Sequence, residues 1–565
     1  MNEKVIIYQL FPRIFGNRNR NRKPGGTIAE NGCGKFDDFS LQLLRKIKDL
    51  GVTHIWYTGI IRHASTTDYS VYGIPRQHPS VVKGRAGSPY AIADYYDVDP
   101  DLATDVSRRM MEFESLIERT HRAGLKAIID FVPNHVARQY HSVCRPSRVA
   151  DLGENDDANL YFSPQNNFYY LPGEAFCPQF DLQGYTEYPA RATGNDCFAR
   201  NPSANDWYET IKLNYGVDYC ADGTRQAHFE PLPDTWGKML QILQFWTSKG
   251  IDGIRCDMAE MVPLPFWKWA VEKLKMQFPN LEIIGEVYQP GLYEQFLAAG
   301  FDYLYDKVGM YDCLRGIVEN HRPAADITCQ WQRTDHFRSQ MLYFLENHDE
   351  QRIASDFFSK DARKAFPAMT VMALLGKNPL MIYAGQEFGE RGMDIEGFSG
   401  EDGRTTIFDY WSLQTLIDGY FEPRNQSDEA RETKAFYQKI LFLATTEKAV
   451  FAGEMFDLMY VNPHLAARQF VFLRKKDDEL LLVAANFSSE DTTLDITIPP
   501  HAFEHLQMKE GLWKATELIT GEATDLCLKS NQPVEVVLSP LASSVFKIKF
   551  NSNERRTDEL HAQWA

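Results

Sequence analysis

The chain has 565 residues and a net charge of −17, with 44% hydrophobic, 24% charged and 13% aromatic residues. This length predicts more than one domain, and the composition excludes disordered and collagen-like proteins. The acidic charge disfavours nucleic acid and anionic membrane surfaces as partners, so we expect a neutral partner.

The cysteines and the N-terminal residues indicate the compartment. Nine cysteines follow no regular spacing and form no CxxC pair, which predicts neither a disulfide framework nor a zinc cage. Residues 5–10 do not resemble a signal peptide, and no stretch approaches the ~18 apolar residues of a membrane helix. We therefore expect a cytoplasmic protein, although a secreted or periplasmic chain with its signal peptide removed would look the same. The oligomeric state is left open.

Short apolar runs alternate with longer amphipathic segments up to Thr446, an order typical of parallel strands joined by helices. Helices are predicted at residues 106–123 and in the segment from Asp234 to Gly250. Eight strands are predicted, which favours a closed barrel. They are residues 5–10, 54–57, 127–129, 253–256, 282–284, 303–305, 341–345 and 379–383.

Two regions break this alternation. About a hundred residues after Asn134 show no clear period, and because a loop of that length is uncommon in a compact domain, we expect a small inserted subdomain after the third strand. After Thr446 the pattern changes to period two, which predicts an antiparallel β-sandwich. The predicted α/β fold is a (β/α)8 TIM barrel at 1–135 and 234–446, an insertion at 136–233, a C-terminal β-sandwich at 447–552 and a loose tail at 553–565.

Four predicted strands are followed by an acidic residue: Asp130, Asp257, Glu286 and Asp349. Because parallel strands bring their carboxyl ends to one rim of a barrel, we expect these side chains to meet. A single acid at a strand end is more often a turn former or a helix cap. Four of them, with two histidines and an arginine close in sequence, indicate a site.

The spacing of these residues predicts paired carboxylates with different roles. Arg255 and Asp257 are two residues apart, so an extended strand points both to one face, and the guanidinium is expected to keep Asp257 ionised as a nucleophile requires. Glu286 follows an apolar strand and is a candidate acid with a raised pKa. A retaining glycosidase uses such a pair, about 5 to 5.5 Å apart.

Four segments resemble the α-amylase family of glycoside hydrolases: residues 130–135 (DFVPNH), 253–257 (GIRCD), 285–288 (GEVY) and 346–349 (ENHD). Residues 9–15, 90–100, 379–389 and 403–411 also look like that family, so the resemblance covers nearly the whole chain. It implies a retaining hydrolase of α-1,4 links in starch, glycogen or maltodextrins, with no redox cofactor.

The resemblance also implies roles for single residues. Asp257 matches the nucleophile, and Glu286 matches the acid that later serves as base. Asp349 matches the third acid, which holds ring hydroxyls and helps to flatten the sugar.

The other matching residues surround those three acids. Arg255 would fix the nucleophile, and Asp130 would support the site from behind. His135 and His348 match hydroxyl donors, although a lone histidine such as His135 more often satisfies a local hydrogen bond. Tyr90 matches a ring that stacks on the sugar, and a core ring is nearly as common a reading.

The resemblance leaves calcium open. Asn134 matches the family's metal-ligand position, but spacing does not identify its partners in the insertion. Asp156 and Asp157 are candidates, and adjacent acids are more often a solvated turn. Aromatic residues of the insertion are either sugar platforms or its core: Phe168, Tyr169, Tyr170 and Trp207.

One departure limits what transfers from the family. Many starch-cleaving members carry Lys-His after the nucleophile, where this chain has Glu260-Met261, so the leaving-group side differs. Two alternatives stay open: a glucanotransferase with the same site, in which the acceptor side excludes water, and a non-catalytic glucan-binding protein, against which the intact acids argue.

Overall fold

The computed structural model describes residues 4–220 and 223–550, so the predicted tail at 553–565 lies outside the described residues. Eight parallel strands form one sheet in the order β15-β14-β13-β12-β5-β2-β1-β16. A parallel bridge between Tyr343 and Leu380 joins the outer strands, so the sheet closes. The predicted barrel is confirmed, with β1 (Ile6–Leu10), β2 (His54–Tyr57), β5 (Lys126–Phe131), β12 (Gly253–Cys256), β13 (Glu282–Gly285), β14 (Tyr303–Tyr305), β15 (Met341–Leu342) and β16 (Leu380–Tyr383).

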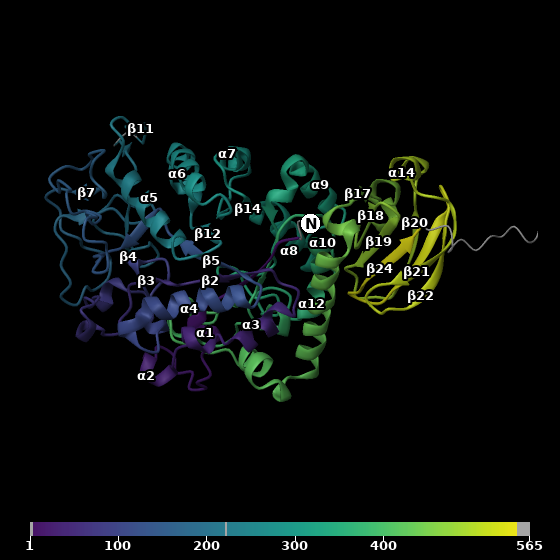
Figure 1. Cartoon of the computed structure of the whole chain (residues 1–565), viewed down its shortest axis with the longest axis horizontal. Coiled ribbons are helices and arrows are strands. Elements are labelled where there is room, and N and C mark those ends of the chain that lie inside the picture. The colour runs from purple at the N-terminus through teal and green to yellow at the C-terminus, as the bar shows by residue number, and fades with distance from the viewer. Residues whose placement is uncertain (1–3, 221–222, 551–565) are drawn as a thin grey trace, which may run out of the picture.

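Helices surround this sheet (Figure 1). The two helices predicted by periodicity are present as α4 (Arg109–Arg122) and α5 (Asp234–Thr247), and each buries an apolar stripe. Others follow the remaining strands: α3 (Leu41–Lys48), α6 (Leu264–Gln277), α7 (Tyr293–Ala298), α8 (Asp312–Val318), α9 (Asp326–Arg333), α10 (Phe366–Leu374) and α12 (Asp428–Thr446).

Strand β12 differs from the other seven strands in the residues that it contributes to the barrel interior. Seven strands contribute an apolar residue to a buried cluster, among them Ile128 of β5 and Ile284 of β13. On β12 the residues paired with these two are Gly253 and Arg255. A Cβ on Gly253 would lie 3.0 Å from Ile128 Cγ1, so glycine suits that close approach. Arg255 therefore brings a guanidinium into the barrel.

The inserted residues follow β5 and contain no α-helix in the described ranges 138–220 and 223–233. They form β6 (His135–Ala137), β7 (Tyr170–Leu171), β8 (Ala190–Arg191), β9 (Thr210–Lys212), β10 (Val217–Tyr219) and β11 (Arg225–Ala227), paired two by two. Figure 1 shows this segment at the end of the molecule opposite the C-terminal strands.

Eight strands at the C-terminal end form antiparallel sheets. β17 (Glu454–Asp457), β18 (Gln469–Lys476), β19 (Glu479–Asn486), β24 (Ser543–Lys549), β21 (Gly511–Glu517) and β22 (Ala523–Leu528) make six strands of one sheet, and β20 (Thr492–Thr497) pairs with β23 (Pro533–Leu538). α12 packs on α10 through Phe366 and Phe436, whose rings stack 3.9 Å apart. The antiparallel pairing of the C-terminal strands confirms the predicted antiparallel C-terminal unit.

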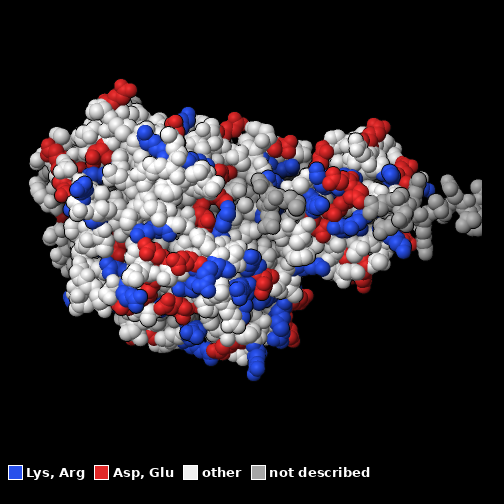
Figure 2. All heavy atoms as spheres, in the orientation of Figure 1, with Lys and Arg blue, Asp and Glu red and all other residues white. Residues whose placement is uncertain are grey.

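The surface charge, the cysteines and the length of the helices bear on three expectations from the sequence. Acidic and basic side chains are interspersed over the face in Figure 2, so the negative charge is not gathered there in one patch. All nine cysteines are free thiols. No helix in residues 4–220 and 223–550 has both the length and the apolar character of a membrane span.

Asp306 is a buried acid at the end of β14. It caps the turn that follows, because its Oδ1 accepts from Met310 N–H at 2.9 Å. Burial raises the pKa of this carboxyl from 3.8 to about 6. Since the folded state binds this proton more tightly than the unfolded chain, the group lowers the free energy of unfolding as the pH rises from about 4 to about 6.

Asp306→Asn removes this charge at every pH. Between pH 4 and pH 8 the variant should therefore gain about 1 to 3 kcal/mol of unfolding free energy relative to wild type. Urea denaturation at the two pH values measures the gain. Asp335→Asn is the control, since that side chain is 60% exposed and should gain nothing. Equal behaviour of the two variants would refute the assignment.

Candidate active site

A cleft of about 400 Å³ opens at the carboxyl ends of the barrel strands. Five residues predicted from the sequence lie in its wall: Tyr90, His135, Asp257, Glu286 and Asp349. They come from segments spread over some 260 positions, and the parallel barrel brings them together. The wall also contains Lys83, Ser88, Trp207, Glu209, Thr210, Met258, Tyr288, Ile407 and Phe408.

The Arg255 guanidinium lies among the acids. Its Nη1 donates to Asp257 Oδ1 at 2.7 Å and lies 3.3 Å from Asp130 Oδ1, while its Nη2 is 2.8 Å from Glu286 Oε2. Asp130 also accepts from Trp56 Nε1 at 2.8 Å and is buried. One fully buried guanidinium therefore spans the carboxylates of Asp257 and Glu286.

The turn after Asp257 holds Glu286 in place. Met258 has a left-handed backbone with φ 44°, which is uncommon for a bulky residue and indicates local strain. This turn lets Met258 N–H donate to Glu286 Oε2 at 2.7 Å. Tyr288, two residues beyond Glu286, donates its hydroxyl to Oε1 at 2.5 Å. Glu286 therefore has polar surroundings, unlike the apolar ones expected from the strand before it.

The electrostatics of Asp257 also differ from the expectation. Burial raises the pKa of Asp257 well above its usual range, and the Glu286 charge raises it further, because together they outweigh the Arg255 guanidinium. Desolvation in the cleft and the Glu286 charge raise the pKa of Asp349 to about 7, although 43% of its side chain is exposed. Burial raises the pKa of Asp130 to about 6. Burial therefore favours the protonated forms of Asp257 and Asp349, and because the Glu286 charge acts on both, the charge state of one acid affects the titration of the others.

The histidines of the site are held in neutral form. Burial lowers the pKa of His348 well below its usual range. Gln9 Nε2 donates to His348 Nδ1 at 2.8 Å, so the proton is on Nε2, which lies 3.1 Å from Asp349 Oδ2. The Tyr90 ring stacks on His348 with centroids 5.2 Å apart. Burial likewise lowers the pKa of His135 to about 3.

Removal of the Tyr288 hydroxyl tests whether its hydrogen bond orients the Glu286 carboxyl group. Tyr288→Phe should lower kcat about 10- to 100-fold, the cost of one hydrogen bond to a charged group, without lowering the melting temperature. The control is Tyr293→Phe, because the buried Tyr293 hydroxyl has no hydrogen-bond partner among the described residues. Steady-state kinetics of both variants decide the point, and an unchanged kcat in Tyr288→Phe would count against this role.

The structure decides between the two interpretations of the insertion's aromatic residues. Phe168, Tyr169 and Tyr170 are buried in the packing of the insertion, so they are core residues and not sugar platforms. Only Trp207 of that set lines the cleft, where its ring lies 5.2 Å from the ring of His135. Glu260 accepts from the N–H groups of Tyr288 and Gln289 and so holds the loop that carries Tyr288.

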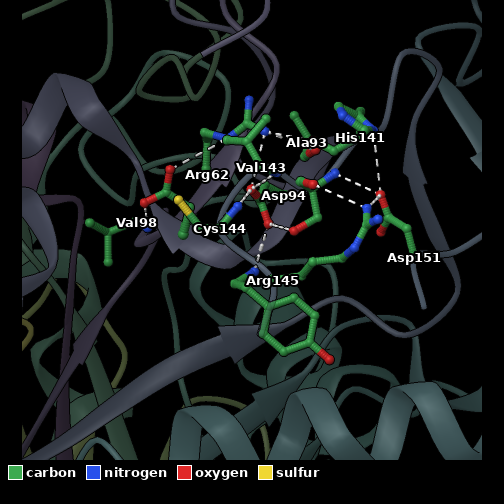
Figure 3. Close-up of polar contacts among 12 residues, drawn as sticks. Arg62, Ala93, Asp94, Val98, His141, Val143, Cys144, Arg145 and Asp151 are labelled. Atoms are coloured by element: carbon green, nitrogen blue, oxygen red, sulfur yellow. Dashed lines mark hydrogen bonds and ion pairs between the residues drawn. The ribbon is translucent and has the colours of Figure 1, made fainter. Parts of the chain in front are cut away.

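Among the described residues, Asp94, Asp97 and Cys144 form the one group of three or more His, Cys, Asp or Glu side chains whose ligand atoms lie close enough to hold a metal ion. Figure 3 shows Asp94 beside Arg62 and the backbone of Cys144. Asp94 lies 3.4 Å from Arg62, and Asp97 pairs with Arg109 at 2.7 Å. Arg109 also donates to the Cys144 sulfur. The guanidinium groups of Arg62 and Arg109 thus already contact the ligand atoms of all three side chains, so these side chains do not fit a metal ion.

The predicted metal position at Asn134 does not fit calcium either, which takes six to eight oxygens. Asn134 Oδ1 accepts from Lys212 Nζ at 2.8 Å, and Asn134 Nδ2 donates to the Gly194 carbonyl at 2.7 Å. The other two candidate ligands, Asp156 and Asp157, accept hydrogen bonds from backbone groups of the insertion. Asp156 accepts from the N–H groups of Asn167 and Phe168, and Asp157 accepts from the N–H of Asn159.

Comparisons with known proteins agree with this geometry. A sequence model described as "Alpha amylase, catalytic domain" matches residues 9–290. Neopullulanase 2 of Thermoactinomyces vulgaris is 22% identical over 88% of this chain and 72% of its own length. Alpha-amylase 3 of Dictyoglomus thermophilum is 22% identical over 93% of both chains. The crystal structure of the α-amylase from Geobacillus thermoleovorans, complexed with acarbose, superposes with a TM-score of 0.64 at 18% identity, over 97% of this chain and 98% of that one.

The barrel with acids at its carboxyl rim and the matching sequence model define the class: this chain is a glycoside hydrolase. More particularly, it belongs to the α-amylase family.

Proposed function

We propose that this chain is a retaining α-glycoside hydrolase that cleaves α-1,4-glucosidic bonds of starch, glycogen or maltodextrins. The observation that carries this proposal is the Arg255 guanidinium, which contacts Asp257 and Glu286 in the wall of one cleft. Two carboxylates held this way match the pair that a retaining glycosidase needs. The names of the relatives, which include a neopullulanase and an α-amylase, support an α-glucan substrate.

The first step would form a glycosyl–enzyme ester. Asp257 attacks the anomeric carbon while Glu286 donates a proton to the glycosidic oxygen, so the carbon–oxygen bond breaks and the sugar fragment leaves as an alcohol. The Arg255 guanidinium, which donates to Asp257 Oδ1, favours the ionised carboxylate that attacks. Tyr288 and the Met258 N–H orient the Glu286 carboxyl.

The second step would release the sugar with its configuration retained. Glu286 accepts a proton from water, the water oxygen attacks the anomeric carbon, and the Asp257 ester bond breaks. Asp349 and the neutral His135 and His348 contact sugar hydroxyls, where hydrogen bonds that strengthen in the transition state lower the barrier. Tyr90 and Trp207 offer flat faces to the sugar rings.

A product profile on soluble starch, pullulan and maltotriose tests this function. Hydrolysis of α-1,4 bonds should raise the concentration of reducing ends and release the α-anomer first. New oligosaccharides without a rise in reducing ends would instead indicate a glucanotransferase, and binding of maltooligosaccharides without turnover would indicate a non-catalytic protein. A β-anomer released first would overturn the retaining mechanism.

A further inference from the structure

Lys212 contacts Asn134, the residue that matches the metal-ligand position of α-amylases. Its ammonium is 2.8 Å from Asn134 Oδ1 and 2.6 Å from Asp196 Oδ1, and only 2% of the side chain is exposed. Lys212 is in β9, which pairs with β6 so that Lys212 lies opposite His135. One buried ammonium therefore joins the segment after the third barrel strand to the insertion.

The charges around Lys212 suit a monovalent cation. In the part of the chain that the structure describes, Asp196 is the carboxylate that pairs with Lys212, and one ammonium neutralises it. Asn134 brings no charge. The second oxygen of Asp196 lies 3.5 Å from Arg225. A divalent ion bound between the same oxygens would be repelled by the Lys212 charge at contact distance.

Asn134 links this cation to the cleft. Its Nδ2 lies 3.2 Å from His135 Nδ1 and donates to the carbonyl of Gly194. Gly194 packs so closely that a Cβ there would lie 2.8 Å from His135 Cβ. The insertion thus rests directly against His135, whose ring lines the cleft.

We propose that Lys212 is a built-in cation that replaces the metal ion, so that this chain neither needs nor binds calcium at Asn134, and that Lys212 positions His135 in the cleft. The lysine joins the segment that carries Asn134 to the insertion, through one amide oxygen and one carboxylate.

Melting of the wild-type protein tests the first part. The full chain, treated with EDTA and then supplied with excess calcium chloride, should melt at one temperature in both conditions. A melting temperature that falls with EDTA and recovers with calcium would overturn the proposal. This measurement needs no substrate, so it does not depend on the proposed function.

A pair of lysine variants tests the positioning role, which rests on the proposed function. Lys238 is the matched control, because it is also buried in contacts with the insertion, 2.7 Å from Asp234 Oδ2 and 2.8 Å from Asn167 Oδ1. Lys212→Met and Lys238→Met should both lower the melting temperature. Only Lys212→Met should also lower kcat, at least about tenfold with KM little changed, because His135 is then misplaced.

Equal kcat losses in both variants, or none in Lys212→Met, would overturn the positioning role. If Lys212→Met does not fold, Asp196→Asn replaces it, since Asp196 is 25% exposed and its amide still accepts from Lys212. That variant should show a smaller loss of kcat with KM little changed. Wild-type kcat in Asp196→Asn would then refute the role. Inactivity of the wild-type chain itself would count against the proposed function and leave the melting result valid.

Discussion

Asp257→Asn and Glu286→Gln should each lower kcat at least about 1000-fold, because the first removes the nucleophile and the second removes the proton donor. Neither should lower the melting temperature, because Arg255 keeps two carboxylate partners in each variant. Asp257 is a buried acid whose pKa is raised, so the neutral amide removes an unfavourable charge from the folded state. The measurements are kcat on a maltooligosaccharide and thermal denaturation of the same samples.

The matched control for these variants is Asp306→Asn. Asp306 is also a buried strand-end acid of the barrel, but it caps a turn and lies outside the cleft wall. Its variant should keep kcat within a few-fold of wild type. Near-wild-type activity in either cleft variant would refute the role given to that acid.

Arg255→Met should abolish turnover and also destabilise the fold. Arg255 is fully buried against Asp257, Asp130 and Glu286, so its loss leaves three buried acids without their cation. Removal of one partner from a buried charge pair costs about 3 to 5 kcal/mol. Urea denaturation measures this loss, and kinetics at a temperature well below the melting transition separate it from the loss of activity.

Arg62→Met is the control for the arginine variant. Arg62 is buried and lies 3.4 Å from Asp94 and 3.8 Å from Asp97, in the charge cluster of Figure 3. It should lose comparable stability but keep kcat within a few-fold, because its carboxylate partners do not line the cleft. If the two variants lost the same activity, Arg255 would be a structural residue alone.

Much of the barrel could be predicted because its signals are local. Each strand is a short apolar run, and the acids that follow strands at Asp257 and Glu286 need only the rule that parallel strands end at one rim. The same rule also shows its limit at Asp306, which follows β14 in the same way but serves as a turn cap. An acid at a strand end therefore identifies the rim and not the role.

The contacts that orient the site could not be predicted, because they depend on the closed barrel. Gln9 of β1 reaches His348, and Trp56 of β2 reaches Asp130, across strand neighbours that only the sheet order sets. The left-handed turn at Met258 leaves no signal in sequence, since a methionine rarely adopts it. The contact of Tyr288 with Glu286 could have been predicted, because residues two apart on an extended chain point to the same face.

The insertion shows why the sequence could not tell aromatic core residues from aromatic residues of the cleft. Phe168, Tyr169 and Tyr170 are consecutive, and an irregular segment without helices has few other groups with which to build a core. Trp207 differs only in its tertiary position beside His135. Lys212 gave no signal in the sequence, because its partner Asn134 is 78 residues away.

Trapping of the glycosyl–enzyme tests whether Asp257 is the nucleophile. A 5-fluoro-α-glucosyl fluoride should lose fluoride and form an ester with the nucleophile that breaks down slowly, and peptide mass spectrometry then locates the sugar. The added mass should lie on the peptide that contains Asp257, and none should be found in Asp257→Asn. A sugar attached to any other residue would contradict it.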